Sequence, residues 1–350
     1  MLALKLLSIQ YLRAIAALFI VLYHIFVQLA RLGYNGSAPQ FLSNGVDIFF
    51  VISGFIMWYT TFNKNVRSPD FFLHRIIRIV PLYWLVTTFY VAILVVEPSW
   101  LQSSKLQISH VIASYLFIPA THPVVTQFMW PLVPAGWTLN YEMFFYLLFG
   151  LALLCPRHLR QLVVVTMLMG VVALQLSGPP ANSIIGFYSS SIMLEFALGV
   201  SLGYLFTTGI SFRGPSSAFM LFAGLIGLVV GTLPSLAELP RLVTVGIPAC
   251  LFVAGAVFLE RSHNVSEIAV PKLLGDASYS IYLSHGAVLS AFEQFWRATR
   301  LPYMLEPAFA FIFLIVSLIV ATITGVALYY FAERPLLNKF HSAMKWMGHK

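Results

Sequence analysis

The chain has 350 residues, of which 59% are hydrophobic and only 9% are charged, and its mean hydropathy is +0.87. A soluble protein has a charged fraction of about 25%, so this composition excludes a soluble globular protein and indicates a polytopic membrane protein. The formal net charge of +8 comes from basic residues spread between hydrophobic runs rather than gathered in a patch with interleaved aromatic residues, which argues against nucleic-acid binding.

The first apolar run is longer than the core of a signal peptide, and no convincing small-x-small cleavage motif follows it, so we expect a retained span. The two cysteines, Cys155 and Cys250, lie at the end of or within apolar runs. Their spacing provides neither a disulfide framework nor a metal-ligand motif, so we expect buried thiols and no metal site. No segment suggests a separate soluble domain, and we predict one membrane-embedded domain over residues 1–350.

Ten runs are long enough to cross about 30 Å of hydrocarbon as helices. They lie near residues 7–30, 45–62, 76–96, 137–155, 161–177, 183–206, 217–236, 241–259, 276–296 and 307–331. The segment 110–119 is also apolar, but it is short for a span, and we expect it to be interfacial or re-entrant. The predicted fold is therefore an all-α bundle of about ten transmembrane helices.

The positions of Lys and Arg orient this bundle. With a cytoplasmic N-terminus and a non-spanning 110–119 segment, most basic residues fall inside, as the positive-inside rule requires. The inside residues are Lys64, Arg67, Arg75, Arg78, Arg157, Arg160, Arg213, Arg261, Lys272, Arg334, Lys339, Lys345 and Lys350, and the outside residues are Arg31, Lys105, Arg241, Arg297 and Arg300. A spanning 110–119 segment would weaken this bias, so we predict that both termini are cytoplasmic.

The first predicted helix carries two basic residues at membrane depth, Arg13 and His24, which are eleven residues apart. Eleven helical steps return to within about 20° of the starting direction and rise about 16 Å, so both side chains share one face. An ionisable group costs at least about 2.5 kcal/mol at the bilayer centre, so it normally faces the protein interior or a wet cavity. We expect this helix to line a site, with Arg13 toward the cytoplasm and His24 toward the outer side.

Two carboxylates are predicted at a depth comparable to that of His24. Asp47 lies in GVDIFFVISGF at the start of the second span, and Glu142 lies in GWTLNYEMFFY at the start of the fourth. A carboxylate that orients a neutral histidine is the arrangement used in general-base catalysis of acyl transfer. Alternatively, Arg13, Asp47 and Glu142 neutralise one another inside the bundle. The sequence favours neither interpretation over the other.

Arg75 and Arg78 lie three residues apart in HRIIRIVPLYW, at the cytoplasmic start of the third predicted span. On a helix these positions are neighbours, and two guanidinium groups form a receptor for phosphates such as those of a nucleotide-bearing cofactor. More often, such arginines only set the topology and contact lipid headgroups. Glu195 and His285 are further ionisable residues within spans and candidates to line the cavity. For His285 we favour a hydrogen bond between helices.

Seven motifs occur in order along the chain: Arg13 with His24, GVDIFFVISGF, the Arg75–Arg78 pair, GWTLNYEMFFY, EFALG at Glu195, GDASYSIYLSH near 275–285, and AERPL at 332–336. In these motifs the chain resembles the acyltransferase-3 family of integral membrane acyltransferases, in particular an exopolysaccharide O-acetyltransferase. The resemblance implies transfer of an acyl group, usually acetyl from acetyl-CoA, to a carbohydrate hydroxyl group in the bacterial inner membrane. It marks Arg13, His24, Arg75 and Arg78 as functional positions.

Together, the residues and the resemblance give a mechanism. Arg75, Arg78 and Arg13 would hold the phosphates of acetyl-CoA, and His24 would act as general base, oriented by Asp47 or Glu142. The candidate donors to the oxyanion are Trp137, Asn140, Tyr141 and Ser284. The longest non-spanning stretch, residues 97–136, is where we expect the acceptor to enter. Expected partners are the carbohydrate acceptor, membrane lipids, and either polysaccharide biosynthesis machinery or a second copy of the chain.

Two alternatives remain from the sequence. Intramembrane Arg, His, Asp and Glu also build the pathways of secondary transporters and flippases. However, the chain shows neither an internal repeat nor paired Gly/Pro-interrupted helices, which many transporters have. The other alternative is a non-catalytic partner in an envelope-polysaccharide assembly.

Overall fold

The structure is a computed structural model, which describes residues 6–34, 36–101, 104–263, 265–299 and 307–347. The regular structure of these residues is entirely helical, without a strand, which confirms the predicted all-α class. Arg300 and Lys350, which the predicted topology places outside and inside, lie outside the described residues.

The helices form two compact units whose segments alternate along the chain. Unit 1 comprises residues 1–19, 40–72 and 141–276, and unit 2 comprises residues 20–39, 73–140 and 277–350. Three helices pass from a segment of one unit into a segment of the other: α1 (Leu7–Arg31), α3 (Ser68–Val96) and α5 (Trp137–Ala152). The single membrane-embedded domain over 1–350 stays a prediction.

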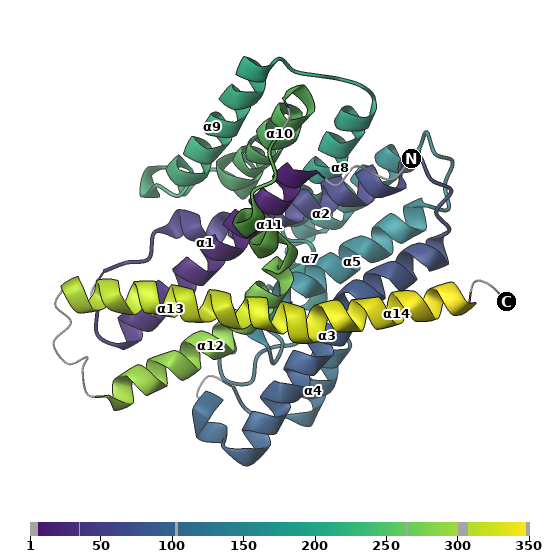
Figure 1. Cartoon of the computed structure of the whole chain (residues 1–350). Coiled ribbons are helices and arrows are strands. Elements are labelled where there is room, and N and C mark those ends of the chain that lie inside the picture. The colour runs from purple at the N-terminus through teal and green to yellow at the C-terminus, as the bar shows by residue number, and fades with distance from the viewer. Residues whose placement is uncertain (1–5, 35, 102–103, 264, 300–306, 348–350) are drawn as a thin grey trace. The chain divides into compact units, whose positions relative to one another are not determined.

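Unit 1 is built on two helix pairs, α2 with α8 and α9 with α10, whose members lie side by side (Figure 1). Its elements are η1 (Gln40–Asn44), α2 (Gly45–Thr61), α6 (Arg160–Ala173), η4 (Leu174–Ser177), α7 (Ile184–Tyr188), α8 (Met193–Thr207), α9 (Gly214–Val230), η5 (Pro234–Leu236), the π-helical turn η6 (Leu242–Gly246), α10 (Ile247–Ser262) and α11 (Ala269–Asp276). The apolar core of this unit gathers side chains from α1, α2, α8, α9 and α10.

Glycines allow the backbones of α2 and α8 to approach closely. A Cβ atom on Gly54 would lie 2.3 Å from the carbonyl oxygen of Phe196, and one on Gly199 would lie 2.1 Å from that of Val51. Close approach of helix backbones at small residues is typical of membrane proteins, in which lipid provides no hydrophobic driving force for helix association.

The first turn of α1 is capped by a carboxylate from another helix of unit 1. The backbone N–H groups of Leu7 and Ser8 each donate to Glu260 of α10 at 2.8 Å, and the Ser8 hydroxyl donates to it at 2.5 Å. The first N–H groups of a helix have no partner within the helix, and the helix dipole favours a negative charge there. Glu260 thus satisfies both demands and fixes the start of the helix that carries Arg13 and His24.

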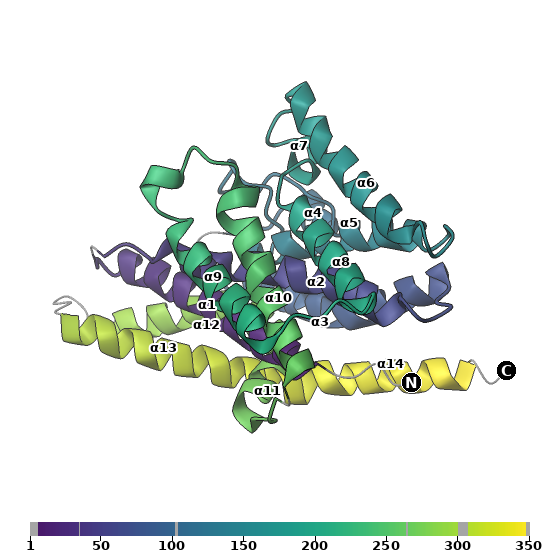
Figure 2. The ribbon, with the colours of Figure 1, turned by 90° about the horizontal axis from the view of Figure 1, so that it is seen from above.

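Unit 2 contains η2 (Pro98–Leu101), α4 (Ile108–Tyr115), η3 (Pro134–Gly136), α12 (Ser278–Ala298), α13 (Pro307–Leu328), the π-helical turn η8 (Tyr329–Glu333) and α14 (Arg334–Met347). In the two views of Figures 1 and 2, α13 and α14 continue in nearly the same direction as one long rod. The π turn η8 lies at their junction, and α12 packs along α13.

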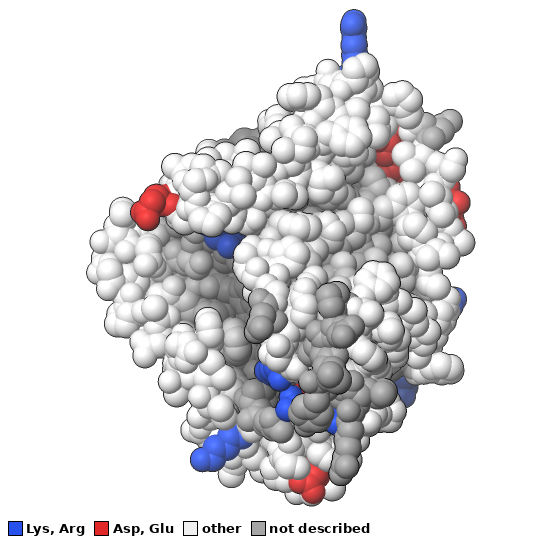
Figure 3. Space-filling view, turned by 90° about the vertical axis from the view of Figure 1, so that its left-hand side faces the viewer, with Lys and Arg blue, Asp and Glu red and all other residues white. Residues whose placement is uncertain are grey.

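Seven helical segments among the described residues are long and apolar enough to cross a membrane. They are Leu7–Arg31, Gln40–Thr61, Ser68–Val96, Arg160–Ser177, Ile184–Thr207, Leu242–Ser262 and Ala308–Phe340. The three other predicted spans coincide with α5, α9 and α12, so all ten runs are helical, while ten crossings stay a prediction. Charged residues are sparse on the face shown in Figure 3.

The segment 110–119 overlaps one helix, the eight-residue α4 (Ile108–Tyr115), which is about 12 Å long and cannot cross the hydrocarbon by itself. The chain leaves this helix through Phe117, whose φ of 56° is left-handed. The structure therefore supports the expectation that this segment does not span.

We predict that Gly199→Ala destabilises the protein by about 1–3 kcal/mol, because the added methyl group forces α2 and α8 apart. The matched control is Gly170→Ala on α6, where a Cβ atom meets nothing within 4 Å. That variant should be neutral or more stable by up to about 1 kcal/mol, because alanine favours a helix over glycine. Thermal unfolding of the detergent-solubilised variants measures both effects, and equal midpoints would refute the close α2–α8 contact.

Candidate functional site

The two histidines predicted at membrane depth lie together in unit 2. His24 is on α1 and His285 is on α12, and their ring centroids are 4.9 Å apart with 40° between the ring planes. His285 is buried, whereas His24 is partly exposed. No hydrogen bond reaches His24 from the part of the chain that the structure describes, so both of its ring nitrogens are available to a substrate.

The surroundings of His285 determine which of its nitrogens carries the proton. Its Nδ1 lies 2.5 Å from the carbonyl oxygen of Tyr282. Because a carbonyl only accepts, the neutral ring has its proton on Nδ1 and its lone pair on Nε2. The Tyr282 hydroxyl donates to the carbonyl of Ala135 at 3.1 Å and lies 2.9 Å from the hydroxyl of Thr138. These contacts tie the helix that carries His285 to the start of α5.

The Arg75–Arg78 pair lies on α3, within unit 2, and both side chains are partly exposed. Arg78 forms an ion pair with Glu333, whose second carboxylate oxygen accepts from the Ser280 hydroxyl at 2.5 Å. The guanidinium carbon of Arg78 also lies 5.5 Å from the ring centroid of Tyr279. Arg13 lies on the unit 1 portion of α1 and is partly exposed, and its contribution to phosphate binding stays a prediction.

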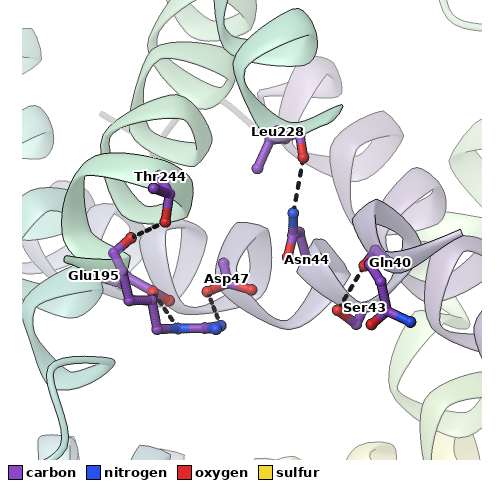
Figure 4. Close-up of polar contacts among 8 residues, drawn as sticks. Gln40, Ser43, Asn44, Asp47, Glu195, Leu228 and Thr244 are labelled. Carbon is purple, nitrogen blue, oxygen red and sulfur yellow. Dashed lines mark hydrogen bonds and ion pairs between the residues drawn. The ribbon is translucent and has the colours of Figure 1, made fainter. Parts of the chain in front are cut away.

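In unit 1, Asp47 of α2 and Glu195 of α8 point toward each other and share one arginine (Figure 4). Arg241 donates to Asp47 through Nη2, and its Nε lies 3.6 Å from the Glu195 carboxylate. Both carboxylates are buried, and one oxygen of each, Oδ2 of Asp47 and Oε2 of Glu195, lacks a hydrogen bond among the described residues. Nearby, the Asn44 side chain donates to the carbonyl of Leu228 at 3.0 Å.

Glu142, the other carboxylate predicted to orient His24, is bound within unit 1. It accepts hydrogen bonds from the hydroxyls of Ser53, at 3.0 Å, and Tyr146. The structure thus gives Asp47 and Glu142 partners of their own, and a role for either in orienting His24 stays a prediction.

The four predicted oxyanion donors differ in their existing hydrogen bonds. Tyr141 donates to the carbonyl of Phe187 at 2.6 Å, and Ser284 donates to that of Ser280 at 2.8 Å. Asn140 is 0% exposed, yet its amide nitrogen and oxygen both lack a hydrogen-bond partner among the described residues. Trp137 is partly exposed at the start of α5.

An unpaired buried polar group costs about 1–3 kcal/mol, and in native proteins such a group calls for an explanation such as a functional role. The Asn140 amide can therefore donate a hydrogen bond to a reacting group. The hydroxyl protons of Tyr141 and Ser284 are already used in hydrogen bonds to backbone carbonyls.

The segment 97–136, where we expect the acceptor to enter, belongs to unit 2, and hydrogen bonds join several of its described residues. Ser114 of α4 accepts from the backbone N–H of Leu132 at 2.8 Å, and His110 donates through Nε2 to the carbonyl of Trp130 at 2.8 Å. Trp130 stacks on Phe128 with ring centroids 4.2 Å apart. Burial of the His122 side chain, with the nearby His110, lowers its pKa. The role of the segment 97–136 in acceptor entry stays a prediction.

Sequence reasoning missed two charged residues at these sites. From the sequence, Arg241 is predicted only to lie in an outside loop, and Glu333 is part of the AERPL motif without a predicted role. The two π-helical turns of the described chain lie next to these residues: η6 begins directly after Arg241, and η8 ends at Glu333. A π turn often marks a functional position, but sequence periodicity does not reveal it. The signal that was available for Glu333 is a glutamate at the end of a long apolar run.

Comparison with known proteins identifies the family. The acyltransferase-3 family (Acyl_transf_3), described as "Acyltransferase domain", matches residues 6–326. The chain is also 36% identical over 300 residues to the "Exopolysaccharide production protein ExoZ" of Rhizobium meliloti (strain 1021), and this alignment covers 84% of the chain and 89% of that protein. No solved structure matches the chain.

The apolar helices of the structure agree with a membrane location, and the match of the family spans nearly all of them. The ordered motifs, the all-helical fold and both comparisons lead to one conclusion: the chain belongs to the acyltransferase-3 family and is an integral membrane acyltransferase.

Proposed function

We propose that the chain is an O-acyltransferase that moves an acyl group, most simply acetyl, from cytoplasmic acyl-CoA to a hydroxyl group of a carbohydrate. The acceptor is a surface or exopolysaccharide, or its lipid-linked precursor. Family membership supports acyl transfer, and the name of the ExoZ relative supports a polysaccharide acceptor. We also propose that the chain crosses a bacterial inner membrane ten times and that both of its termini lie in the cytoplasm.

One observation carries the assignment of the site: the contact of His24 with His285 inside unit 2. A neutral imidazole with unoccupied nitrogens can accept the proton of an alcohol, which is the task of the base in acyl transfer. His285 carries its lone pair on Nε2, so it joins Asp47 and Glu142 as a candidate to orient His24.

In the proposed step, the carbohydrate hydroxyl attacks the thioester carbonyl of acyl-CoA while His24 takes the hydroxyl proton. A tetrahedral oxyanion forms, the carbon–sulfur bond then breaks, and the proton passes to the departing CoA thiolate. The acyl group moves directly from sulfur to oxygen, so no acyl-enzyme is required. Asn140 supplies the hydrogen bond to the oxyanion through its amide nitrogen, which has no other acceptor among the described residues.

The donor phosphates bind to Arg75 and Arg78, with Arg13 as a further contributor. Two guanidinium groups one helical turn apart match the charge and geometry of phosphate groups. Trp137, Tyr141, Glu195 and Ser284 are the remaining candidates for substrate contacts. Of these, Tyr141 is buried in unit 1 and stacks on Phe187 with ring centroids 4.2 Å apart.

The proposal is tested by transfer of radiolabelled acetyl from acetyl-CoA into carbohydrate in membranes that contain the protein. We expect His24→Ala to lower the rate by about 10²–10⁴-fold, the usual contribution of a general base. Arg75→Ala combined with Arg78→Ala should abolish transfer at low acetyl-CoA concentration. The matched control is His158→Ala, a histidine on an exposed loop, which should keep the wild-type rate.

Expression and membrane insertion must be equal among these variants. Wild-type transfer by well-inserted His24→Ala protein would refute the role of His24 as base. If wild-type protein transfers no label but moves carbohydrate across the membrane, the chain is a transporter.

For Asn140 we predict that a substitution lowers activity without lowering stability. Asn140→Ala should lower kcat by about 10²–10³-fold, as removal of an oxyanion donor does. Its thermal midpoint should stay equal or rise, because the substitution removes an unpaired buried amide. The matched control is Asn44→Ala. The buried amide of Asn44 donates to the carbonyl of Leu228, so its removal should lower the thermal midpoint. A loss of stability in Asn140→Ala with unchanged kcat would reverse this assignment.

A further inference from the structure

We propose that Glu333 positions Arg78 for the phosphates of the acyl donor. The inference rests on the proposed function and deepens it, because it adds to the donor site a residue that never touches the donor. Glu333 belongs to the AERPL motif, which the proposed mechanism does not otherwise use.

The carboxylate of Glu333 is buried and uses both of its oxygens. Its side chain is 1% exposed. Oε1 accepts from Arg78 of α3, and Oε2 accepts from the Ser280 hydroxyl of α12 at 2.5 Å. A buried carboxylate is stable only when it is paired and hydrogen-bonded, and here both conditions are met. Glu333 therefore joins three helical elements of unit 2 at one point.

The backbone around Glu333 supports a specific placement. Glu333 is the last residue of the π-helical turn η8, which lies between α13 and α14. A π turn inserts an extra residue into the helical register and so changes the direction of the side chains that follow. Such insertions are rare, and they are frequently found at functional sites. Here the turn ends at the residue that meets Arg78.

Arg78 is also held from α12. Its guanidinium lies over the Tyr279 ring at 5.5 Å, and the Tyr279 hydroxyl donates to the carbonyl of Ile79 at 2.8 Å, next to Arg78 in the chain. The Arg78 side chain nevertheless remains 28% exposed. The buried carboxylate and the ring thus both restrain the guanidinium, while part of the side chain reaches the surface.

This arrangement suits a group that binds phosphate. A guanidinium has five N–H donors in a rigid fork, and the arginine side chain loses rotamer entropy when it is immobilised. Contacts that fix the side chain before the donor arrives remove part of that cost from donor binding. Loss of the Glu333 charge should therefore weaken acyl-CoA binding and leave the chemical step at saturating donor nearly unchanged.

The test compares the KM for acetyl-CoA and the kcat of four proteins: wild type, Glu333→Gln, Glu333→Asp and Glu293→Gln. Glu293→Gln is the matched control, since Glu293 is another buried glutamate of unit 2 that pairs with an arginine, Arg297. We expect Glu333→Gln to raise the KM for acetyl-CoA about tenfold with kcat within about twofold of wild type. Glu333→Asp should recover part of the affinity because it keeps the charge, and Glu293→Gln should leave the KM unchanged.

Equilibrium binding of radiolabelled acetyl-CoA without acceptor should show the same order. If Glu333→Gln does not fold, Ser280→Ala serves as the second variant, because it removes one of the two hydrogen bonds that hold Glu333 and should raise the KM by a smaller factor. An unchanged KM in folded Glu333→Gln, or a fall in kcat alone, would overturn the inference while leaving the proposed function standing. If wild-type protein neither binds nor uses acetyl-CoA, the proposed function fails and the inference fails with it.

Discussion

The structure depends on one constraint: a polar group inside an apolar helical bundle must find its partner within the protein, because hydrocarbon offers none. Glu260 meets this constraint at the start of α1 by accepting from Leu7 and Ser8. Glu333 meets it by pairing with Arg78, and one carboxylate oxygen of Asp47, Oδ1, meets it by pairing with Arg241. Each of these contacts joins residues far apart in the sequence. They hold together helices whose apolar surfaces alone would not determine which helix packs against which.

Some polar groups of the protein have no such partner in the part of the chain that the structure describes. Among the residues that the structure describes, the buried amide of Asn140 is unpaired, and His24, which is partly exposed, has no hydrogen bond. Both belong to unit 2, as do His285 and the Arg75–Arg78 pair. Groups left unpaired at a cost in stability are the ones that can bind and transform a substrate, since their hydrogen-bonding capacity is not already used. The proposed base and the proposed oxyanion donor therefore share one property: hydrogen-bonding capacity that no described residue uses.

Much of the fold could be predicted from the sequence, because the length and hydropathy of a run determine whether it forms an apolar helix. All ten predicted runs are helical, and 110–119 contains a helix too short to span. The finer breaks could not be predicted: the run 183–206 divides into α7 and α8, and a π turn opens the run 241–259. These breaks depend on tertiary contacts that hydropathy does not record.

For the site, the sequence identified His24, His285, Arg75 and Arg78 as candidates, but it did not identify their partners. Arg241 resembles any loop arginine in the sequence, and only the fold places it between Asp47 and Glu195. The pairing of Arg78 with Glu333 spans 255 positions, so no local pattern indicates it. The sequence favours a hydrogen bond between helices for His285, whereas in the structure its Nδ1 donates within its own helix, to the carbonyl of Tyr282.

The most direct test of the central claim is the release of CoA thiol by the purified protein reconstituted in lipid vesicles, measured with acetyl-CoA in the presence and absence of an exopolysaccharide acceptor. The account predicts that thiol release depends on the acceptor and equals, mole for mole, the ester-linked acetyl gained by the carbohydrate. Carbohydrate that crosses the vesicle membrane without consumption of acetyl-CoA, or thiol release that is indifferent to the acceptor, would contradict it.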